Sequence, residues 1–154
     1  MAIVGDGQMA LVLSDVLSVR GIAATIVSPF AEEGARLSRE RSSPRLPGFR
    51  LHDRVVVTAD HAAVSAATLV VCAIPTQFIR TTFGRIGPSL ARWTPVVSIA
   101  KGIEVESFRL PCEILAGTCG DRAVAALSGP TIAAELARRL PAVLVAASPD
   151  AALS

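Results

Sequence analysis

The sequence is poor in charged and aromatic residues, and above all in lysine. Charged residues make up 18% of the 154 residues and aromatic residues 4%, whereas apolar residues make up 51%. Lys101 is the sole lysine among the 15 basic residues. The net charge of +2 gives no reason to expect a nucleic-acid partner. A chain this apolar and of this length is expected to form one domain around a sheet covered on both faces.

Cysteine pairs and metal-ligand spacings are missing as well. Cys72, Cys112 and Cys119 form no C-x-x-C motif, so we expect neither a disulfide framework nor a metal site. His52 and His61 have no partner at metal-ligand spacing and are expected at the surface. Cys72 lies within an apolar run, which predicts a buried thiol.

Long hydrophobic runs are absent too. No apolar stretch reaches the roughly 20 residues that a membrane-spanning helix needs. The longest apolar region, residues 55–75, is interrupted by Asp60, His61 and Ser65. The first residues lack the basic region of a secretory signal. We therefore expect a cytoplasmic protein with no membrane span.

Strand-like and helix-like segments alternate along the whole chain. Strands are predicted at residues 2–4, 23–27, 55–57, 68–74, 95–99, 123–127 and 143–147. Helices are predicted at residues 8–20, 29–41, 60–66, 76–92, 107–117 and 131–139. Gly87-Pro88 should interrupt the fourth helix, Pro111 should begin the fifth, and Trp93 should pack against a helix end. This alternation indicates βαβ units and a doubly wound, mostly parallel α/β sheet.

A glycine-rich turn follows the first predicted strand. Gly5-Asp-Gly7-Gln-Met-Ala10 fits the pattern G-x-G-x-x-G/A between a strand and a helix. Gly5 permits the tight turn, Gly7 lets the backbone approach a pyrophosphate, and Ala10 allows close helix–strand packing. N–H groups at the start of the helix then face the phosphates, which favours dinucleotide binding over an empty turn. The carboxylate of Asp6 would repel phosphates unless its side chain points outward.

The end of the second strand bears on the choice between NAD and NADP. An acidic residue there commonly binds the ribose hydroxyls of NAD, but this strand ends in Ser28, and Glu32 and Glu33 come a turn later. Ser28 is compatible with a 2′-phosphate, and Arg36 or Arg39 could supply positive charge. The sequence therefore slightly favours NADP. An equally good interpretation places both arginines on a solvated helix face, so the cofactor stays NAD or NADP.

Four further segments resemble the motifs of one enzyme family. They are Pro44-Arg-Leu-Pro-Gly48, Ala73-Ile-Pro-Thr-Gln-Phe78, Ser98-Ile-Ala-Lys-Gly-Ile-Glu104, and Leu127-Ser-Gly-Pro-Thr-Ile-Ala-Ala-Glu135 followed by Leu140-Pro141. With the glycine turn they span nearly the whole chain in the family's order. The sequence thus resembles the amino-terminal domain of NAD(P)-dependent glycerol-3-phosphate dehydrogenase.

The resemblance implies a Rossmann-type dinucleotide-binding domain over residues 1–154. The family's enzymes are oxidoreductases that interconvert sn-glycerol 3-phosphate and dihydroxyacetone phosphate by hydride transfer. They thereby provide precursors of glycerophospholipids, with NAD or NADP as cofactor. The expected partner is a small-molecule phosphate substrate, and the resemblance allows a homodimer of the complete enzyme.

The resemblance also implies roles for individual residues. Substrate contacts are expected from Lys101, Gly129 and Thr131, with Lys101 between the nicotinamide and the substrate. From the residues alone, Thr131 could equally cap the helix that follows it. Cofactor contacts are expected from the glycine turn and from three later segments, at Gly5, Gly7, Gln8, Met9, Ala10, Phe78, Lys101 and Ala133.

The family's proton-transferring lysine belongs to a carboxyl-terminal helical domain. Because Lys101 is the sole lysine, we expect the catalytic lysine beyond Ser154, in a helical domain that this chain lacks. The chain would then be truncated before its catalytic domain and inactive alone. It would also expose an apolar face that the helical domain covers in the complete enzyme.

Two other functions stay open at this point. Another Rossmann reductase, such as a 2-dehydropantoate reductase or a hydroxyacid dehydrogenase, would share the glycine turn. The segments around Lys101 and Gly129 favour glycerol-3-phosphate dehydrogenase over these. A non-catalytic nucleotide-binding module is the other alternative, and the missing catalytic half is its support.

Overall fold

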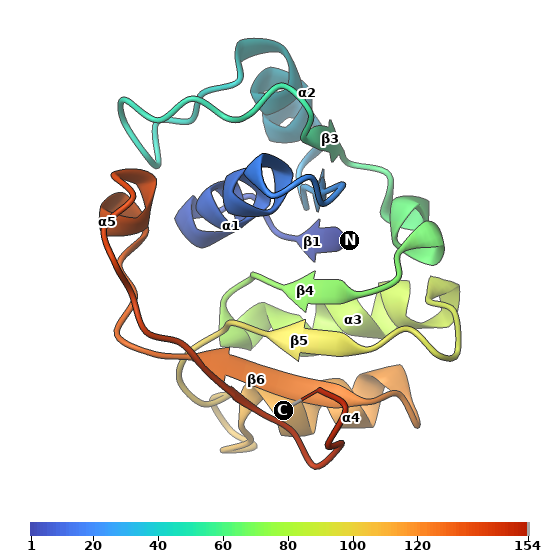
Figure 1. Cartoon of the computed structure of the whole chain (residues 1–154). Helices are drawn as coiled ribbons and strands as arrows, with labels where there is room; N and C mark the ends of the chain where they lie inside the picture. The colour runs from blue at the N-terminus through green and yellow to red at the C-terminus, as the bar shows by residue number, and fades with distance from the viewer. Residues whose placement is uncertain (154) are drawn as a thin grey trace.

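The computed structural model describes residues 1–153, so Ser154 lies outside the described residues. A seven-stranded sheet forms the centre of the molecule, and helices lie on both of its faces (Figure 1). The strand order is β3-β2-β1-β4-β5-β6-β7. The pairings from β3 to β6 are parallel, and β7 pairs antiparallel with β6. The predicted doubly wound, mostly parallel sheet is therefore confirmed.

All seven predicted strands are present, although several are shorter than predicted. The strands are β1 (Ala2–Val4), β2 (Thr25–Val27), β3 (Val56–Thr58), β4 (Val70–Cys72), β5 (Val96–Ser98), β6 (Val124–Ser128) and β7 (Val145–Ala147).

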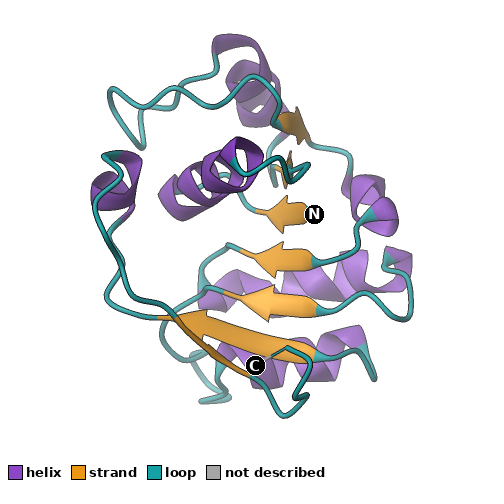
Figure 2. Cartoon of the chain, viewed as in Figure 1, coloured by secondary structure: helices purple, strands orange, loops and turns teal. Residues whose placement is uncertain are grey.

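The helices follow the predicted order with different bounds (Figure 2). The helix predicted over residues 76–92 is divided into a 3₁₀ turn, an α-helix and a second 3₁₀ turn, and the α-helix ends just before Pro88, whose ring cannot continue it. The helix around Pro111 begins at that residue, where a missing N–H costs nothing. The α-helices are α1 (Gln8–Val19), α2 (Ala31–Glu40), α3 (Ile79–Ile86), α4 (Pro111–Cys119) and α5 (Ala133–Ala137); the 3₁₀ helices are η1 (His61–Ala66), η2 (Thr76–Phe78) and η3 (Gly87–Ser89).

The central strands bury side chains on both faces of the sheet. On β4, Val70 and Cys72 join a core cluster with α3 and α4, whereas Val71 packs on the opposite face with Ala10 of α1. Successive side chains of a strand point to opposite faces, so a sheet covered on both sides needs continuous apolar strands. Burial also raises the pKa of the Cys72 thiol to about 12, as expected for an inert buried cysteine.

Helix α5 lies beside α1, on the opposite side of the sheet from α3 and α4 (Figure 1). The Nη2 atom of Arg139, just after α5, lies 2.6 Å from the Oδ2 atom of Asp15 on α1. Asp15 is nearly buried, so the ion pair supplies it with a counter-charge. This contact connects the last helix to the first.

Trp93 does not pack against a helix end, and that prediction is wrong. Its side chain is 84% exposed. The neighbouring Thr94 is buried and its hydroxyl donates to the Ala67 carbonyl oxygen at 3.1 Å. This turn directs Thr94 inward and leaves Trp93 in solvent. Within residues 1–153, no helix has the length and apolar character needed to cross a membrane.

Candidate functional site

The glycine turn begins where β1 and β4 end side by side. Gly5 has a φ of 118°, a conformation that side chains rarely allow. A Cβ atom at Gly5 would lie 2.5 Å from the Ala73 carbonyl oxygen, in the turn after β4. Both the backbone conformation and the close approach of the neighbouring turn therefore require glycine here.

Gly7 meets a different requirement. It is the N-cap of α1 with a φ of −71°, which any residue can adopt, and a Cβ atom built there has nothing within 4 Å. Among the described residues, no side chain caps α1 and its first turn has no acidic residue. The first N–H groups of the helix thus have no intrahelical acceptor and carry the positive end of the helix dipole. Open space in front of such groups fits a pyrophosphate.

A cleft of about 500 Å³ lies in front of this turn. Its walls include the glycine turn after β1 and the Ala73–Pro75 turn after β4, the point where the strand order reverses. Open α/β sheets bind ligands at this switch point. The rings of Phe30 and Phe78, each 60% exposed, give it apolar surface suited to a base. The cleft is lined by Gly5, Asp6, Gly7, Pro29, Phe30, Arg45, Ala73, Ile74, Pro75, Phe78, Thr81, Thr82 and Arg85.

The Asp6 side chain is buried and does not point outward, so its charge needs another explanation. Its Oδ2 atom accepts a hydrogen bond from the Ser28 hydroxyl at 2.7 Å. Its Oδ1 atom lies 2.8 Å from Nη1 of Arg45. The arginine neutralises the carboxylate, which explains how an acidic residue is accommodated inside the turn.

The side chains that favoured NADP are engaged within the protein. The Ser28 hydroxyl is buried against Asp6. Arg36 pairs with Glu33 at 2.6 Å and with Glu40 at 3.1 Å. The hydrogen bond from Arg36 holds the pKa of the Glu33 carboxyl below its ordinary value. The slight preference for NADP therefore loses its support from Ser28 and Arg36.

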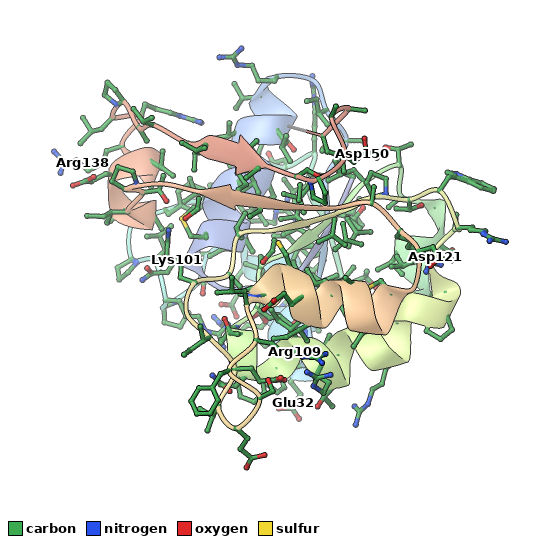
Figure 3. All side chains as sticks on the ribbon, turned by 90° about the horizontal axis from the view of Figure 1, so that it is seen from below. Glu32, Lys101, Arg109, Asp121, Arg138 and Asp150 are labelled. Carbon is green, nitrogen blue, oxygen red and sulfur yellow. The ribbon has the colours of Figure 1, made fainter. Side chains whose placement is uncertain are left out.

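A smaller recess of about 100 Å³ brings Lys101 together with the glycine-turn residue Met9. Lys101, labelled in Figure 3, follows β5. Met9 is the second residue of α1. The sequence predicts this proximity, since carboxyl ends of parallel strands share one edge of the sheet. The recess is lined by Met9, Val12, Leu13, Val16, Ile99, Lys101, Leu127, Thr131, Leu136 and Leu144.

Lys101 contacts the segment after β6. Its Nζ atom donates to the Gly129 carbonyl oxygen at 3.0 Å and lies 3.5 Å from the Ser128 hydroxyl. Gly129 has no room for a side chain, because a Cβ atom would lie 2.2 Å from the Val143 carbonyl oxygen. The structure thus places Lys101, Gly129 and Thr131 around one point.

Thr131 does not cap the following helix, so that alternative is wrong. The N-cap of α5 is Ile132, one residue later, and it makes no side-chain capping bond. The Thr131 hydroxyl instead points back to the Gly129 carbonyl oxygen, at 3.5 Å. This turn keeps the hydroxyl near Lys101 and away from the helix.

The remaining predicted cofactor residues lie in and beside the turn. The Gln8 side chain donates to the carbonyl oxygen of Arg45. Ala10 is fully buried against Ile3 of β1, as its role in helix–strand packing predicts. Ala133 is also buried, in a core cluster with α1 and α2, so the structure gives it a packing position.

Sequence reasoning missed the side chains that hold the Lys101 loop. The Thr76 hydroxyl donates to the Lys101 carbonyl oxygen at 2.8 Å. The Gln77 amide donates to the Ile103 carbonyl oxygen at 2.8 Å and accepts from the backbone of the same loop. Arg80 makes a two-point contact with Glu104. Because these partners are 24 or more residues apart, local patterns carry no signal for them.

A strand, glycine turn and helix facing a cleft at the switch point define the class of dinucleotide-binding Rossmann domains. Residues 1–154 match the family model described as the NAD-dependent glycerol-3-phosphate dehydrogenase N-terminus. The chain belongs to this family. Membership implies NAD or NADP as the cofactor, in agreement with the resemblance found in the sequence.

Known relatives show the same relationship. Glycerol-3-phosphate dehydrogenase [NAD(P)+] from Bradyrhizobium sp. (strain ORS 278) is 35% identical over 154 residues, which are all of this chain and 47% of the relative. The same enzyme from Brucella canis is 33% identical over 98% of this chain. The chain therefore spans about half the length of these relatives.

Solved structures extend the comparison. The crystal structure of glycerol-3-phosphate dehydrogenase from Coxiella burnetii superposes with a TM-score of 0.91 at 25% identity, over 98% of this chain and 47% of that one. A ketopantoate reductase from Ralstonia eutropha superposes with a TM-score of 0.63 at 20% identity, over 86% of this chain and 42% of that one. This second likeness concerns the fold alone.

Proposed function

We propose that this chain is the nucleotide-binding half of an oxidoreductase that interconverts sn-glycerol 3-phosphate and dihydroxyacetone phosphate. One observation carries the proposal: the cleft at the switch point, with the uncapped start of α1 behind it. Family membership supports the substrate, which is a small-molecule phosphate. We also propose a cytoplasmic location and a homodimer for the complete enzyme.

The cleft binds the dinucleotide, and the recess that contains Lys101 lies on the substrate side. The N–H groups around Gly7 hold the pyrophosphate of the dinucleotide, and Phe30 and Phe78 hold its apolar parts in the cleft. The nicotinamide, when bound, supplies or accepts the hydride. The protein binds and orients the reactants.

Lys101 acts on the substrate side. Its ammonium group lies at the sheet edge, where Gly129 and Thr131 also lie. There it can pair with the substrate phosphate or stabilise negative charge that develops on the carbonyl oxygen. Its present hydrogen bond to the Gly129 carbonyl oxygen fixes the direction of the side chain.

We propose that the proton-transferring lysine and the rest of the phosphate site come from a second, helical domain. Lys101 is the one lysine of this sequence, and its position in the recess with Thr131 supports a role in substrate orientation. The relatives have about twice the length of this chain, which leaves room for such a domain. The 154 residues alone are then expected to bind nucleotide without turnover.

Calorimetric titration of the chain with NADH and NADPH tests the binding half of the proposal. Binding of at least one of them near one equivalent is the expected result. Absence of binding by a chain whose far-ultraviolet circular dichroism shows it to be folded would contradict the proposal.

Fusing the chain to the second half of the Bradyrhizobium relative tests the substrate. The expected result is NAD(P)H oxidation that depends on dihydroxyacetone phosphate. Ketopantoate and 2-oxo acids serve as the comparison substrates, because a ketopantoate reductase shares the fold. A fusion that binds cofactor but prefers ketopantoate would replace the proposed function with this alternative.

A further inference from the structure

The carboxylate of Asp6 lies where the ribose-binding acid of an NAD site would reach. The first residue after β2 is Ser28, which carries no charge, yet its hydroxyl donates to Asp6 Oδ2 at 2.7 Å. Asp6 also lines the cleft, although its side chain is only 7% exposed. The glycine turn therefore places a negative charge at the end of β2, where that strand itself has none.

Arg45 completes this arrangement from a loop distant in sequence. Its Nη1 atom lies 2.8 Å from Asp6 Oδ1 and 3.6 Å from Glu33 Oε1. Its side chain is 41% exposed and lines the same cleft. Glu33 in turn is held by Arg36. Two carboxylates thus share the guanidinium that faces the cleft at this end.

A 2′-phosphate and a 2′-hydroxyl would meet this arrangement differently. A hydroxyl can donate a hydrogen bond to a carboxylate and leaves the Asp6–Arg45 pair intact. A phosphate can only accept, and it carries about two negative charges at neutral pH. A phosphate here would lie beside the nearly buried Asp6 carboxylate, and the positive charge of Arg45 is already shared by Asp6 and Glu33.

We infer that the Asp6–Arg45 pair makes this cleft selective for NAD over NADP. The inference rests on the proposed function, because it concerns which dinucleotide the same cleft accepts. It assigns to a residue inside the glycine turn the discrimination that an acid at the end of the second strand usually performs. It also reverses the slight preference for NADP that Ser28 and Arg36 indicate in the sequence.

Two substitutions separate the contributions of the pair. Asp6→Asn keeps the shape and an acceptor for the Ser28 hydroxyl, removes the charge and frees Arg45 for a phosphate. Arg45→Gln removes the cation but leaves the carboxylate. Arg92→Gln is the matched control, since Arg92 is an exposed arginine that does not line the cleft.

The test measures dissociation constants of NADH and NADPH for each variant by fluorescence titration, with 5′-AMP and 2′,5′-ADP as competitors. The wild-type chain should bind NADH about tenfold or more tightly than NADPH, and Asp6→Asn should lower that ratio about tenfold. Arg45→Gln should raise the ratio, and Arg92→Gln should leave it unchanged. The competitors should rank in the same order as the two dinucleotides.

Some results would overturn the inference alone, and others would overturn the proposed function as well. Tighter binding of NADPH by the wild-type chain, or an unchanged ratio in Asp6→Asn, overturns the inference and leaves the proposed function standing. Absence of binding by all folded variants overturns the proposed function itself. Should Asp6→Asn fail to fold, the ratio for Arg45→Gln decides, because a decrease there would mean that the unpaired Asp6 carboxylate does not exclude the 2′-phosphate and would overturn the inference.

Discussion

At the residue scale, the two glycines of the β1–α1 turn serve separate purposes. Gly5 is required by the protein, because of its φ of 118° and its contact with the turn after β4. Gly7 has an ordinary φ and open space where a side chain would be, so the folded chain alone does not require glycine there. We therefore expect the requirement for glycine at position 7 to come from the ligand.

Alanine should therefore lower mainly the stability at Gly5 and mainly dinucleotide binding at Gly7. Gly5→Ala should lower the free energy of unfolding by about 2 kcal/mol or more, because of backbone strain and the contact with Ala73. Gly7→Ala should change it by less than about 0.5 kcal/mol while weakening dinucleotide binding about tenfold or more. Urea denaturation and calorimetry measure the two quantities. Equal effects of both substitutions on stability would contradict this division.

Lys101 is the second position where we expect one residue to decide function. In the fused enzyme, Lys101→Met should reduce kcat/KM for dihydroxyacetone phosphate about ten- to 150-fold, the equivalent of about 1.5–3 kcal/mol for a charge-assisted hydrogen bond. NADH affinity should change little, since Lys101 lies in the recess and outside the lining of the cleft. The matched control is Arg138→Met, which removes an exposed positive charge after α5. An unaltered kcat/KM in Lys101→Met would show that the ammonium group is uninvolved.

At the scale of elements, the loop between β5 and α4 depends on α3 and η2 for its shape. The loop contains three residues with positive φ, Gly102, Glu106 and Phe108. This conformation is unfavourable for the two that are not glycine, so contacts from neighbouring elements must hold the loop. Gln77 and Arg80 hold it from the neighbouring helices. Through these contacts, the position of Lys101 depends on η2 and α3.

The connection through Glu104 should weaken in acid. The hydrogen bond from Arg80, followed by that from Ser107, holds the pKa of the Glu104 carboxyl below its ordinary value of 4.5. A lowered folded-state pKa means that the contribution is complete above about pH 4.5 and is lost as the pH falls through the lowered value. Amide hydrogen exchange of residues 101–110 should therefore rise, after correction for intrinsic rates, between about pH 6 and about pH 3.5.

Glu104→Gln should show the faster exchange already at neutral pH, with little further change in acid. Glu106→Gln is the control, because Glu106 is exposed in the same loop. Identical pH profiles for the wild-type chain and Glu104→Gln would show that this ion pair does not hold the loop.

At the scale of the whole molecule, the edge strand β7 exposes apolar side chains. All three residues of β7 are exposed, and this strand forms an edge of the sheet. Val143 is 68% exposed and Val145 63% exposed. Exposed edge strands with apolar side chains promote association between molecules. That a helical domain covers this face stays a prediction.

The chain should therefore self-associate as its concentration rises. Replacing Val143 and Val145 together with lysine should shift the sedimentation profile toward monomer, because charge on an edge strand opposes pairing. The same change at Val56, an exposed valine on the opposite edge strand β3, should have a smaller effect. Monomeric behaviour of the wild-type chain at high concentration would contradict the prediction.

Local patterns determined the order of the elements and the glycine turn. Apolar runs such as residues 70–72 indicate a strand buried on both faces, since any fold must cover them. Strand, glycine turn and helix are adjacent in the chain, so Gly5 and Gly7 could be recognised without coordinates. Lys101 was recognised because it is the sole lysine and follows a predicted strand.

Only the tertiary structure decided which distant side chains meet. Asp6, Ser28 and Arg45 come from three segments of the chain. Their hydrogen bonds give these side chains a joint role that no single segment indicates. The exposure of Trp93 depends on the hydrogen bond of Thr94 to a residue 27 positions away. Such contacts depend on the order of the strands in the sheet, β3-β2-β1-β4-β5-β6-β7. Hydrophobic periodicity along the chain predicts the strands but not their order.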